Sequence, residues 1–208
     1  MAPKRALVLV DLQYDFMPGG ALAVARGDET VPVAQRLMPR FDAVVATQDW
    51  HPRDHGSFAA NHAGAKPYDT IDLHGLPQVL WPVHCVQGTR GAEFHESLDR
   101  ARITAVFRKG TDPAVDSYSG FFDNGHRKST GLGDWLREHQ IGQLYVLGLA
   151  TDFCVKFTTL DALKEGFDVW LVEDGCRAVE LARGDGDKAI AEMRDAGATI
   201  VESGMITG

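Results

Sequence analysis

The 208-residue sequence lacks the features that mark membrane-spanning, secreted and disulfide-rich proteins. Its first apolar run, residues 6–10, ends at Asp11 and is far too short for a signal peptide or a membrane span. Three cysteines at irregular spacing cannot form a disulfide framework, and no C-x-x-C pair indicates a thiol redox site. We therefore expect a cytoplasmic protein whose cysteines serve chemistry or packing.

Positive charge is also scarce. The chain has 21 Lys and Arg residues against 29 Asp and Glu residues, a formal net charge of −8, and no run of basic residues longer than a pair. A nucleic-acid or anionic-membrane surface needs a basic patch that such a sequence does not supply. We expect no nucleic-acid and no membrane partner, which leaves a small-molecule substrate; a homo-oligomer stays open.

Short apolar runs rich in β-branched residues alternate with helical patterns along the chain. Strands buried on both faces are predicted at residues 6–10, 43–47, 103–107, 144–147, 169–172 and 199–201. Helices are predicted at residues 31–41, 132–139, 155–164 and 188–196. The alternation indicates an α/β fold: one doubly wound domain over residues 1–208, with a six-stranded, mainly parallel sheet and helices on both faces.

One long segment departs from this alternation. Residues 61–89 are rich in Gly, Pro and His and have neither helical nor strand periodicity. A loop of this length inside a compact domain usually has a function. We expect a metal and substrate loop at about residues 50–90, without regular structure over 61–89.

Cys154 occupies a suggestive place in the string GLATDFCVKFTTLDAL, residues 148–163. Asp152 is a good helix N-cap, and the apolar stripe that follows predicts a helix with Cys154 in its first turn. Free amides and the positive end of the helix dipole favour an anion there, so the position favours a nucleophilic thiolate and could hold an oxyanion. On position alone, a small buried packing residue is an equal alternative.

Asp11 and Lys109 each end a predicted strand, in VLVDLQ and AVFRKG. Ligands of open α/β sheets bind beyond the carboxyl ends of the strands, so these side chains can meet the thiol there. Asp11 would then take the thiol proton, and Lys109 would support the ionised groups. For either residue alone, a turn or capping role is the commoner explanation.

A possible metal site comes from Asp49 and His51 in TQDWHP and His84 in WPVHC. Two histidines and one carboxylate form the ligand set of open metal sites. The spacing alone is a weak signal, because D-x-H is common by chance. Cys85 is interpreted as packing, and a supporting role for His55 stays open.

The chain contains, in one order along nearly its whole length, the strings DLQYDFMPGGALAV, TQDWHP, HGSF, WPVHCVQGT, FRKG, DSYSGFFDNG, GLATDFCVKFTTLDAL and EDGCR. In this combination the sequence resembles the nicotinamidase/pyrazinamidase enzymes of the isochorismatase-like cysteine hydrolases. The resemblance implies a doubly wound domain that hydrolyses nicotinamide, and pyrazinamide, to the acid and ammonia through a cysteine thioester. One departure is visible, since Tyr14 stands where the family usually has Asn, and it concerns local loop contacts.

The resemblance also implies roles for individual residues. The implied catalytic triad is Asp11, Lys109 and Cys154. The implied ligands of one divalent Zn, Fe or Mn ion, which would orient the pyridine ring through its nitrogen, are Asp49, His51 and His84. A cis peptide bond at Leu149–Ala150 would turn the amides of Ala150 and Cys154 toward one oxyanion. The implied substrate pocket for a flat ring is Phe16, Leu22, Trp81 and Tyr118.

Two rival functions stay open. A related enzyme of the superfamily would act on a vinyl ether, or on a carbamoyl or ureido amide, although the metal set and aromatic pocket favour a neutral pyridine amide. A sensor that binds metal or a nicotinamide-like ligand without turnover agrees poorly with the presence of acid, amine and thiol together.

Overall fold

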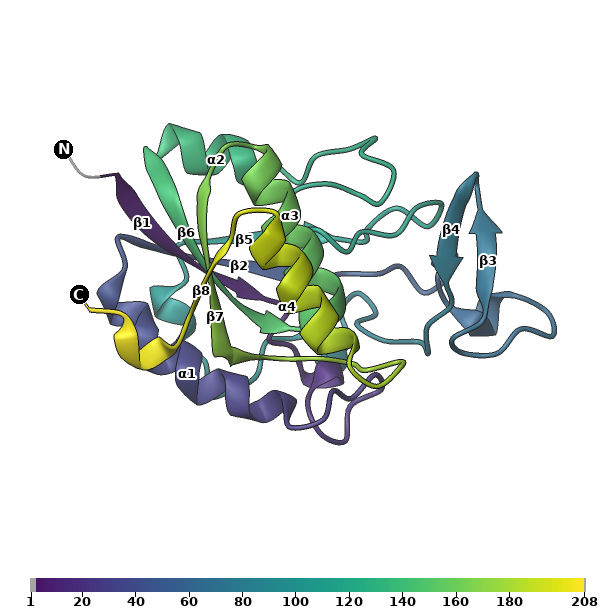
Figure 1. Ribbon diagram of the computed structural model, residues 1–208. Coiled ribbons are helices and arrows are strands. Elements are labelled where there is room, and N and C mark those ends of the chain that lie inside the picture. Colours follow the sequence, from purple (N-terminus) through teal and green to yellow (C-terminus); the bar gives the residue numbers. More distant parts are fainter. Residues whose placement is uncertain (1–2, 208) are drawn as a thin grey trace.

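The computed structural model describes residues 3–207, which are built on a six-stranded sheet in the order β5-β2-β1-β6-β7-β8 (Figure 1). The strands are β1 (Lys4–Val10), β2 (Ala43–Asp49), β5 (Ala105–Lys109), β6 (Ile141–Leu149), β7 (Asp168–Arg177) and β8 (Thr199–Val201). Every neighbouring pair runs parallel. The predicted parallel sheet is confirmed, although its third strand begins at residue 105 and not at 103.

Helices cover both faces of the sheet. They are α1 (Thr30–Leu37), α2 (Leu132–Glu138), α3 (Lys156–Lys164) and α4 (Asp185–Asp195). α1 lies on one face, and α2, α3 and α4 lie on the other, as right-handed crossovers in this strand order require (Figure 1). Within residues 3–207, no helix has the length and apolar character that a membrane crossing requires.

The ends of two predicted helices differ in the structure. Pro39 lies in a separate 3-10 turn, Met38–Arg40, so the first helix ends at Leu37. A proline in a helix interior removes one backbone hydrogen bond, which explains the earlier end. The last helix begins at Asp185, with two acidic residues in its first turn. Acidic residues there are favoured by the helix dipole, a signal that the apolar periodicity alone does not carry.

The strand order reverses between β1 and β6, and this reversal positions the site. The chain moves from β1 to β2 on one side and from β6 to β7 and β8 on the other. Residues Ala6 to Val10 of β1 are fully buried, so the central strand is held rigidly between the two helical layers. The carboxyl ends of the strands beside the reversal form the crevice in which doubly wound proteins bind ligands.

A hairpin corrects the prediction for residues 61–89. β3 (Thr70–Leu73) pairs antiparallel with β4 (Leu76–Val79) and lies apart from the main sheet (Figure 1). Only Leu73 and Gln78 of its eight strand residues are buried. Strands this short, with one buried residue each and Pro77 inside the second, do not produce the alternation by which a strand is predicted from sequence.

Gly148 allows β6 to pass close to β1 just before the turn that carries Cys154. Its φ is +134°, and an added Cβ would lie 2.1 Å from the carbonyl oxygen of Val10. A side chain at this position therefore requires the backbone of one of the two strands to move.

We expect Gly148→Ala to lower the free energy of unfolding by more than about 2 kcal/mol, because the new methyl group clashes with backbone and the φ value is unfavourable for alanine. Urea denaturation followed by circular dichroism measures this change. Gly204→Ala is the control, since nothing lies within 4 Å of its added Cβ, and it should change stability by less than about 0.5 kcal/mol. Equal stability of the two variants would contradict the close approach of the strands.

Candidate active site

The carboxyl ends of the central strands bring four predicted site residues together. Asp11 follows β1, Asp49 and Lys109 end β2 and β5, and Cys154 lies in the turn after β6. All four side chains are buried, with exposed fractions between 0% for Asp11 and 7% for Cys154. Burying a charged group costs free energy unless the group is paired, and these side chains pair with one another.

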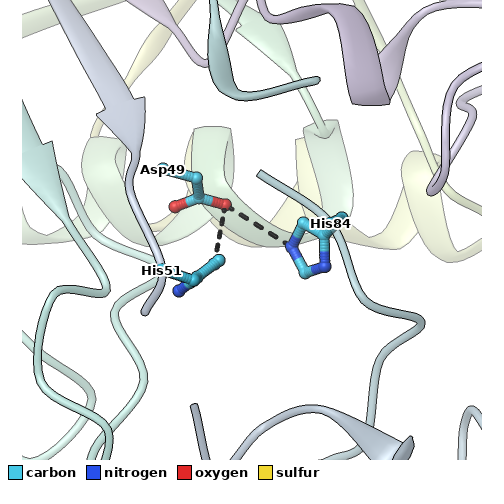
Figure 2. Close-up of side chains that lie close together, drawn as sticks. All are labelled: Asp49, His51 and His84. Carbon is cyan, nitrogen blue, oxygen red and sulfur yellow. Dashed lines mark ion pairs between the residues drawn. The ribbon is translucent and has the colours of Figure 1, made fainter. Parts of the chain in front are cut away.

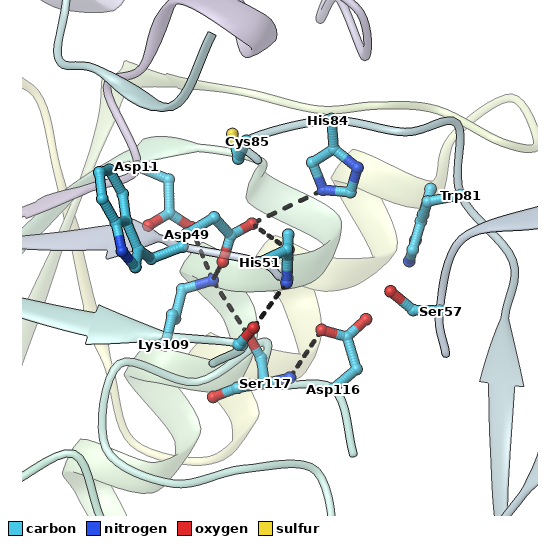
Figure 3. Close-up of polar contacts among 12 residues, drawn as sticks. Asp11, Asp49, His51, Ser57, Trp81, His84, Cys85, Lys109, Asp116 and Ser117 are labelled. Carbon is cyan, nitrogen blue, oxygen red and sulfur yellow. Dashed lines mark hydrogen bonds and ion pairs between the residues drawn. The ribbon is translucent and has the colours of Figure 1, made fainter. Parts of the chain in front are cut away.

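The ammonium group of Lys109 is at the centre of this group (Figure 3). Its Nζ lies 2.9 Å from Oδ2 of Asp11 and 3.3 Å from Sγ of Cys154. It donates to the backbone carbonyl of Ser117 at 3.0 Å and forms an ion pair with Oδ1 of Asp49. Burial acts to lower the pKa of Lys109, but the two carboxylates outweigh it and raise this pKa well above its ordinary value. The ammonium therefore stays charged.

Asp11 is oriented by Thr47, whose hydroxyl donates to Oδ1 at 2.6 Å. A carboxylate oxygen of Asp11 lies within 4.8 Å of the Cys154 sulfur. Burial, the largest influence, raises the pKa of Asp11, although Lys109 opposes it. A raised pKa suits a carboxyl group that accepts a proton and later returns it. Thr47 was missed in the sequence, where its only signal is a polar residue inside an apolar run.

The Cys154 thiol holds its proton in this environment. Burial raises its pKa well above the ordinary value; Lys109 acts to lower it, and Asp11 and Asp49 raise it further. This direction is opposite to the one expected from the helix start, because burial of the sulfur is the largest influence on its pKa. Asp11 is the nearby acceptor to which the proton can move.

The turn that carries Cys154 is a π-helical turn, Thr151–Val155, which leads into α3. Asp152 was predicted to be the N-cap of this helix, but it does not cap it. Its two carboxylate oxygens accept hydrogen bonds from the backbone amides of Val179 and Glu180, each at 2.9 Å. Asp152 thus ties the turn to the segment after β7, a long-range role that sequence spacing does not reveal.

Asp49, His51 and His84 turn their ligand atoms toward one another (Figure 2). Nε2 of His51 and Nε2 of His84 lie 3.5 Å and 3.8 Å from Oδ2 of Asp49. The three ligand atoms all lie within 4.8 Å of one another, and all three residues are buried. The predicted ligand set is therefore assembled as one three-donor centre.

The opposite ring nitrogens orient the two imidazoles. Nδ1 of His51 pairs with the carbonyl of Gly110 at 2.9 Å, and Nδ1 of His84 pairs with the carbonyl of Pro82 at 2.8 Å. A carbonyl only accepts, so each Nδ1 carries a hydrogen, and in the neutral imidazole each Nε2 presents its lone pair toward Asp49. Two lone pairs and a carboxylate oxygen that face one another fit a divalent cation such as Zn, Fe or Mn.

Gln13 fixes the backbone of Asp49 between the two groups. Its Nε2 donates to the Asp49 carbonyl at 2.8 Å, and its Oε1 accepts the Asp49 amide at 2.8 Å. Side-chain amides rarely pair both ways with one backbone residue by chance, and this pair holds the carboxylate in place. Gln13 was not among the predicted site residues, although it lies in the string that includes Asp11.

His55 borders the three-donor centre. Its ring lies 4.5 Å from that of His51, and its Nδ1 pairs with the hydroxyl of Ser57 at 2.7 Å. Burial lowers the pKa of His55 to about 4, so the ring is neutral at physiological pH. His51, His55 and Asp116 offer ligand atoms within 4.8 Å of one another. His55 is therefore adjacent to the predicted metal ligands and belongs to a second group that shares His51.

A cavity opens beside both groups. All four predicted pocket residues line it, namely Phe16, Leu22, Trp81 and Tyr118. So do Asp49, His51, His84, Ala150 and Cys154. Three further lining residues, Asp116, Phe153 and Val179, were missed, although the first two lie inside strings that carried the resemblance.

The cavity wall contains rings that meet edge to face. Phe153 lies 4.8 Å from Trp81 and 5.4 Å from Tyr118, between ring centroids. The Leu149–Ala150 peptide bond at its base is cis, as the resemblance implied. Tyr14 lies outside this lining and donates from its hydroxyl to Glu96 at 3.0 Å.

The comparisons agree with this geometry. The Isochorismatase domain family matches residues 5–204. The nicotinamidase of Escherichia coli (strain K12) is 57% identical over 202 residues, which cover 95% of this chain and 94% of that protein. A solved nicotinamidase/pyrazinamidase of Acinetobacter baumanii superposes with a TM-score of 0.95 at 45% identity and full coverage of both chains. A pyrazinamidase of Pyrococcus horikoshii in complex with zinc superposes with a TM-score of 0.78 at 37% identity, covering 96% of this chain and 99% of that one.

The family match spans most of the chain, and the Escherichia coli relative exceeds half identity over nearly its full length. The parallel sheet and its strand order are those of isochorismatase-like hydrolases. The chain therefore belongs to the isochorismatase domain family.

Proposed function

We propose that this protein is a nicotinamidase, an amidohydrolase that converts nicotinamide to nicotinate and ammonia and accepts pyrazinamide as well. The observation that carries the proposal is one cavity bordered by the Cys154 thiol on one side and by the centre formed by Asp49, His51 and His84 on another. The 57% identity to a nicotinamidase supports the substrate assignment.

The wall of the cavity favours a flat, neutral ring. Phe16, Trp81 and Tyr118 supply aromatic surface, and the residues that line it in the described chain include no Arg or Lys. A carbamoyl or ureido substrate with its own carboxylate would need such a cation. A pyridine or pyrazine carboxamide needs none, which favours it over the rival substrates.

In this proposal Asp49, His51 and His84 would hold one divalent ion. When bound, the ion supplies a Lewis-acid point for a ring nitrogen and so fixes the orientation of the ring. The protein itself supplies the other contacts, because the apolar walls exclude water and keep the carboxamide close to Cys154.

The chemical steps are assigned to Asp11, Lys109 and Cys154. The sulfur of Cys154 attacks the carboxamide carbon while Asp11 takes the thiol proton, and the carbonyl oxygen becomes an oxyanion. The backbone amides of Ala150 and Cys154 are the proposed donors to this oxyanion; loss of one such donor costs about 3 kcal/mol in comparable enzymes. Lys109 remains charged and limits the repulsion between the carboxylates and the developing negative charge.

The intermediate collapses as Asp11 returns the proton to nitrogen, which releases ammonia and leaves a thioester on Cys154. A water molecule then attacks the thioester carbon and gives its proton to Asp11. Departure of the sulfur restores the thiol when Asp11 hands that proton back, and the acid leaves. One amide and one water are consumed, and the enzyme returns to its starting protonation state.

Cys154→Ala is expected to reduce ammonia release from nicotinamide by at least about a thousandfold, because Cys154 is the only Cys, Ser or Thr among the described residues that line the cavity. A coupled ammonia assay measures the rate, and circular dichroism checks the fold. Cys176→Ala is the matched control: this cysteine is equally buried but lies outside the cavity, and its loss should change the rate less than about threefold. Undiminished turnover by Cys154→Ala would end the thioester proposal.

Substituting His51 or His84 with Ala is expected to lower the bound metal from about one ion per chain to well below it, since each change removes one of three ligands. Elemental analysis by plasma mass spectrometry gives the stoichiometry without reference to activity. His139→Ala, at the exposed C-cap position that follows α2, serves as the control and should keep its metal. Unchanged metal content in both site variants would refute this ligand set.

A substrate panel separates the proposal from its rivals. We expect ammonia release from nicotinamide and pyrazinamide to exceed release from N-carbamoyl amino acids by at least about a hundredfold, because no Arg or Lys among the described residues lines the cavity to pair with a substrate carboxylate. The same ammonia assay serves for all amides. A preference for the carbamoyl substrates would assign the protein to a different amidase class, and tight nicotinamide binding without turnover would favour the sensor.

A further inference from the structure

The hairpin of β3 and β4 contains one buried polar side chain, that of Gln78. Gln78 is 2% exposed, whereas its strand neighbours Pro77 and Val79 are exposed or half-buried. It does not line the cavity itself. A buried side-chain amide costs free energy unless its donors and acceptor are satisfied, so its partners indicate what it does.

The carboxamide of Gln78 has its full set of partners. Its Nε2 donates to the carbonyl of Val79 at 2.8 Å and to Oδ2 of Asp116 at 3.0 Å, and lies 3.0 Å from the Tyr118 hydroxyl. Its Oε1 accepts from Nδ2 of Asn124 at 3.4 Å. Because a carbonyl and a carboxylate only accept, the nitrogen must be the atom that faces them, and the orientation of the amide is fixed.

Two of these partners form part of the cavity wall. Asp116 receives a second hydrogen bond at Oδ1, from the amide of Ser117 at 2.8 Å. The Tyr118 hydroxyl also accepts from Nε1 of Trp81, at 3.1 Å. Asp116, Tyr118 and Trp81 all line the cavity, and Figure 3 shows Asp116 and Trp81 on the side of the site that faces His51.

We propose that Gln78 is a positioning residue for the substrate ring: through Asp116 and Tyr118 it sets the shape of the cavity wall that the ring contacts. The inference rests on the proposed function for the identity of the ring. Without the amide, Asp116 keeps only the Ser117 donor and Tyr118 keeps only the Trp81 donor, so both side chains are held less firmly in the cavity wall. In the described part of the chain, Gln78 forms no hydrogen bond with Asp11, Lys109 or Cys154, so we expect this catalytic group to keep its geometry.

The direct test replaces Gln78 with Met, which has a similar length and no donor, and with Glu, which has the same shape but opposes the Asp116 carboxylate. Gln78→Met should raise KM for nicotinamide about tenfold and weaken nicotinate binding by the same factor in calorimetry, while kcat changes less than about threefold. Gln78→Glu should raise KM further, because two carboxylates would face each other. Gln143→Met, at the far end of β6, makes the same chemical change and should leave KM and kcat unaltered.

A double-mutant cycle with Tyr118→Phe identifies the route by which Gln78 acts. If the amide works through the Tyr118 hydroxyl, the double variant Gln78→Met/Tyr118→Phe should have a KM no more than about twofold above that of Gln78→Met alone. Fully multiplicative effects would overturn this route. Tyr118→Phe alone, which removes one oxygen, should raise KM about threefold, and an unchanged KM in this variant would overturn the route through the hydroxyl even if a Gln78 variant does not fold.

The outcomes separate this inference from the proposed function. A wild-type protein that turns over nicotinamide, together with a Gln78→Met variant of unchanged KM, would overturn the positioning role alone. A variant with a lowered melting temperature and unchanged KM would assign Gln78 to hairpin stability only. A wild-type protein without turnover would refute the proposed function. The nicotinate affinities of the variants would still show whether Gln78 affects ligand binding at the cavity wall.

Discussion

The arrangement of the site depends on one buried ammonium group. Lys109 contacts both Asp11 and Asp49, and neither its amine nor either carboxylate has water to solvate it. Removing one member of such a group leaves an uncompensated buried charge, at a cost of about 3 to 5 kcal/mol. The ends of β1, β2 and β5 are therefore bound to one another by charge as well as by the sheet.

Asp49 is the residue through which the two halves of the site are coupled. One of its oxygens faces Lys109, and the other faces His51 and His84. Two carboxylates and one ammonium leave one net negative charge in this buried cluster, and a divalent cation among the three donors would compensate it. The same carboxylate thus ties the position of the proposed metal to the position of the catalytic amine.

Much of the site could be predicted because a parallel sheet places the carboxyl ends of its strands at one edge. The apolar runs indicated the strands, so the polar residues that follow them, such as Asp11 and Lys109, were expected to meet. Their distance in the sequence did not matter, because the topology, and not the spacing, brings them together. Motifs near these ends, including that of Cys154, carried the rest of the prediction.

The parts that could not be predicted depend on contacts between loops. Aspartate is a residue type that often caps the start of a helix, yet the partners of Asp152 are backbone amides that follow β7. Gln78 lies in a strand too short and too exposed to show periodicity, and its partners come from residues 116–124. Such pairs have no local signature, since only the folded path of both loops brings them into reach.

The protonated state of Cys154 follows from the same physics as the shape of the cavity. A cavity wall suited to a neutral aromatic amide excludes water. The absence of water that favours such a ligand also disfavours the charged thiolate form of the cysteine. A nucleophile in this environment has to lose its proton at the moment of attack, so the base must be placed beside it beforehand. Asp11, with a pKa raised by the same burial and an oxygen within 4.8 Å of the sulfur, meets that requirement. In the proposed mechanism, the turn at Thr151–Val155 would then serve the developing oxyanion and would not be needed to ionise the thiol at rest.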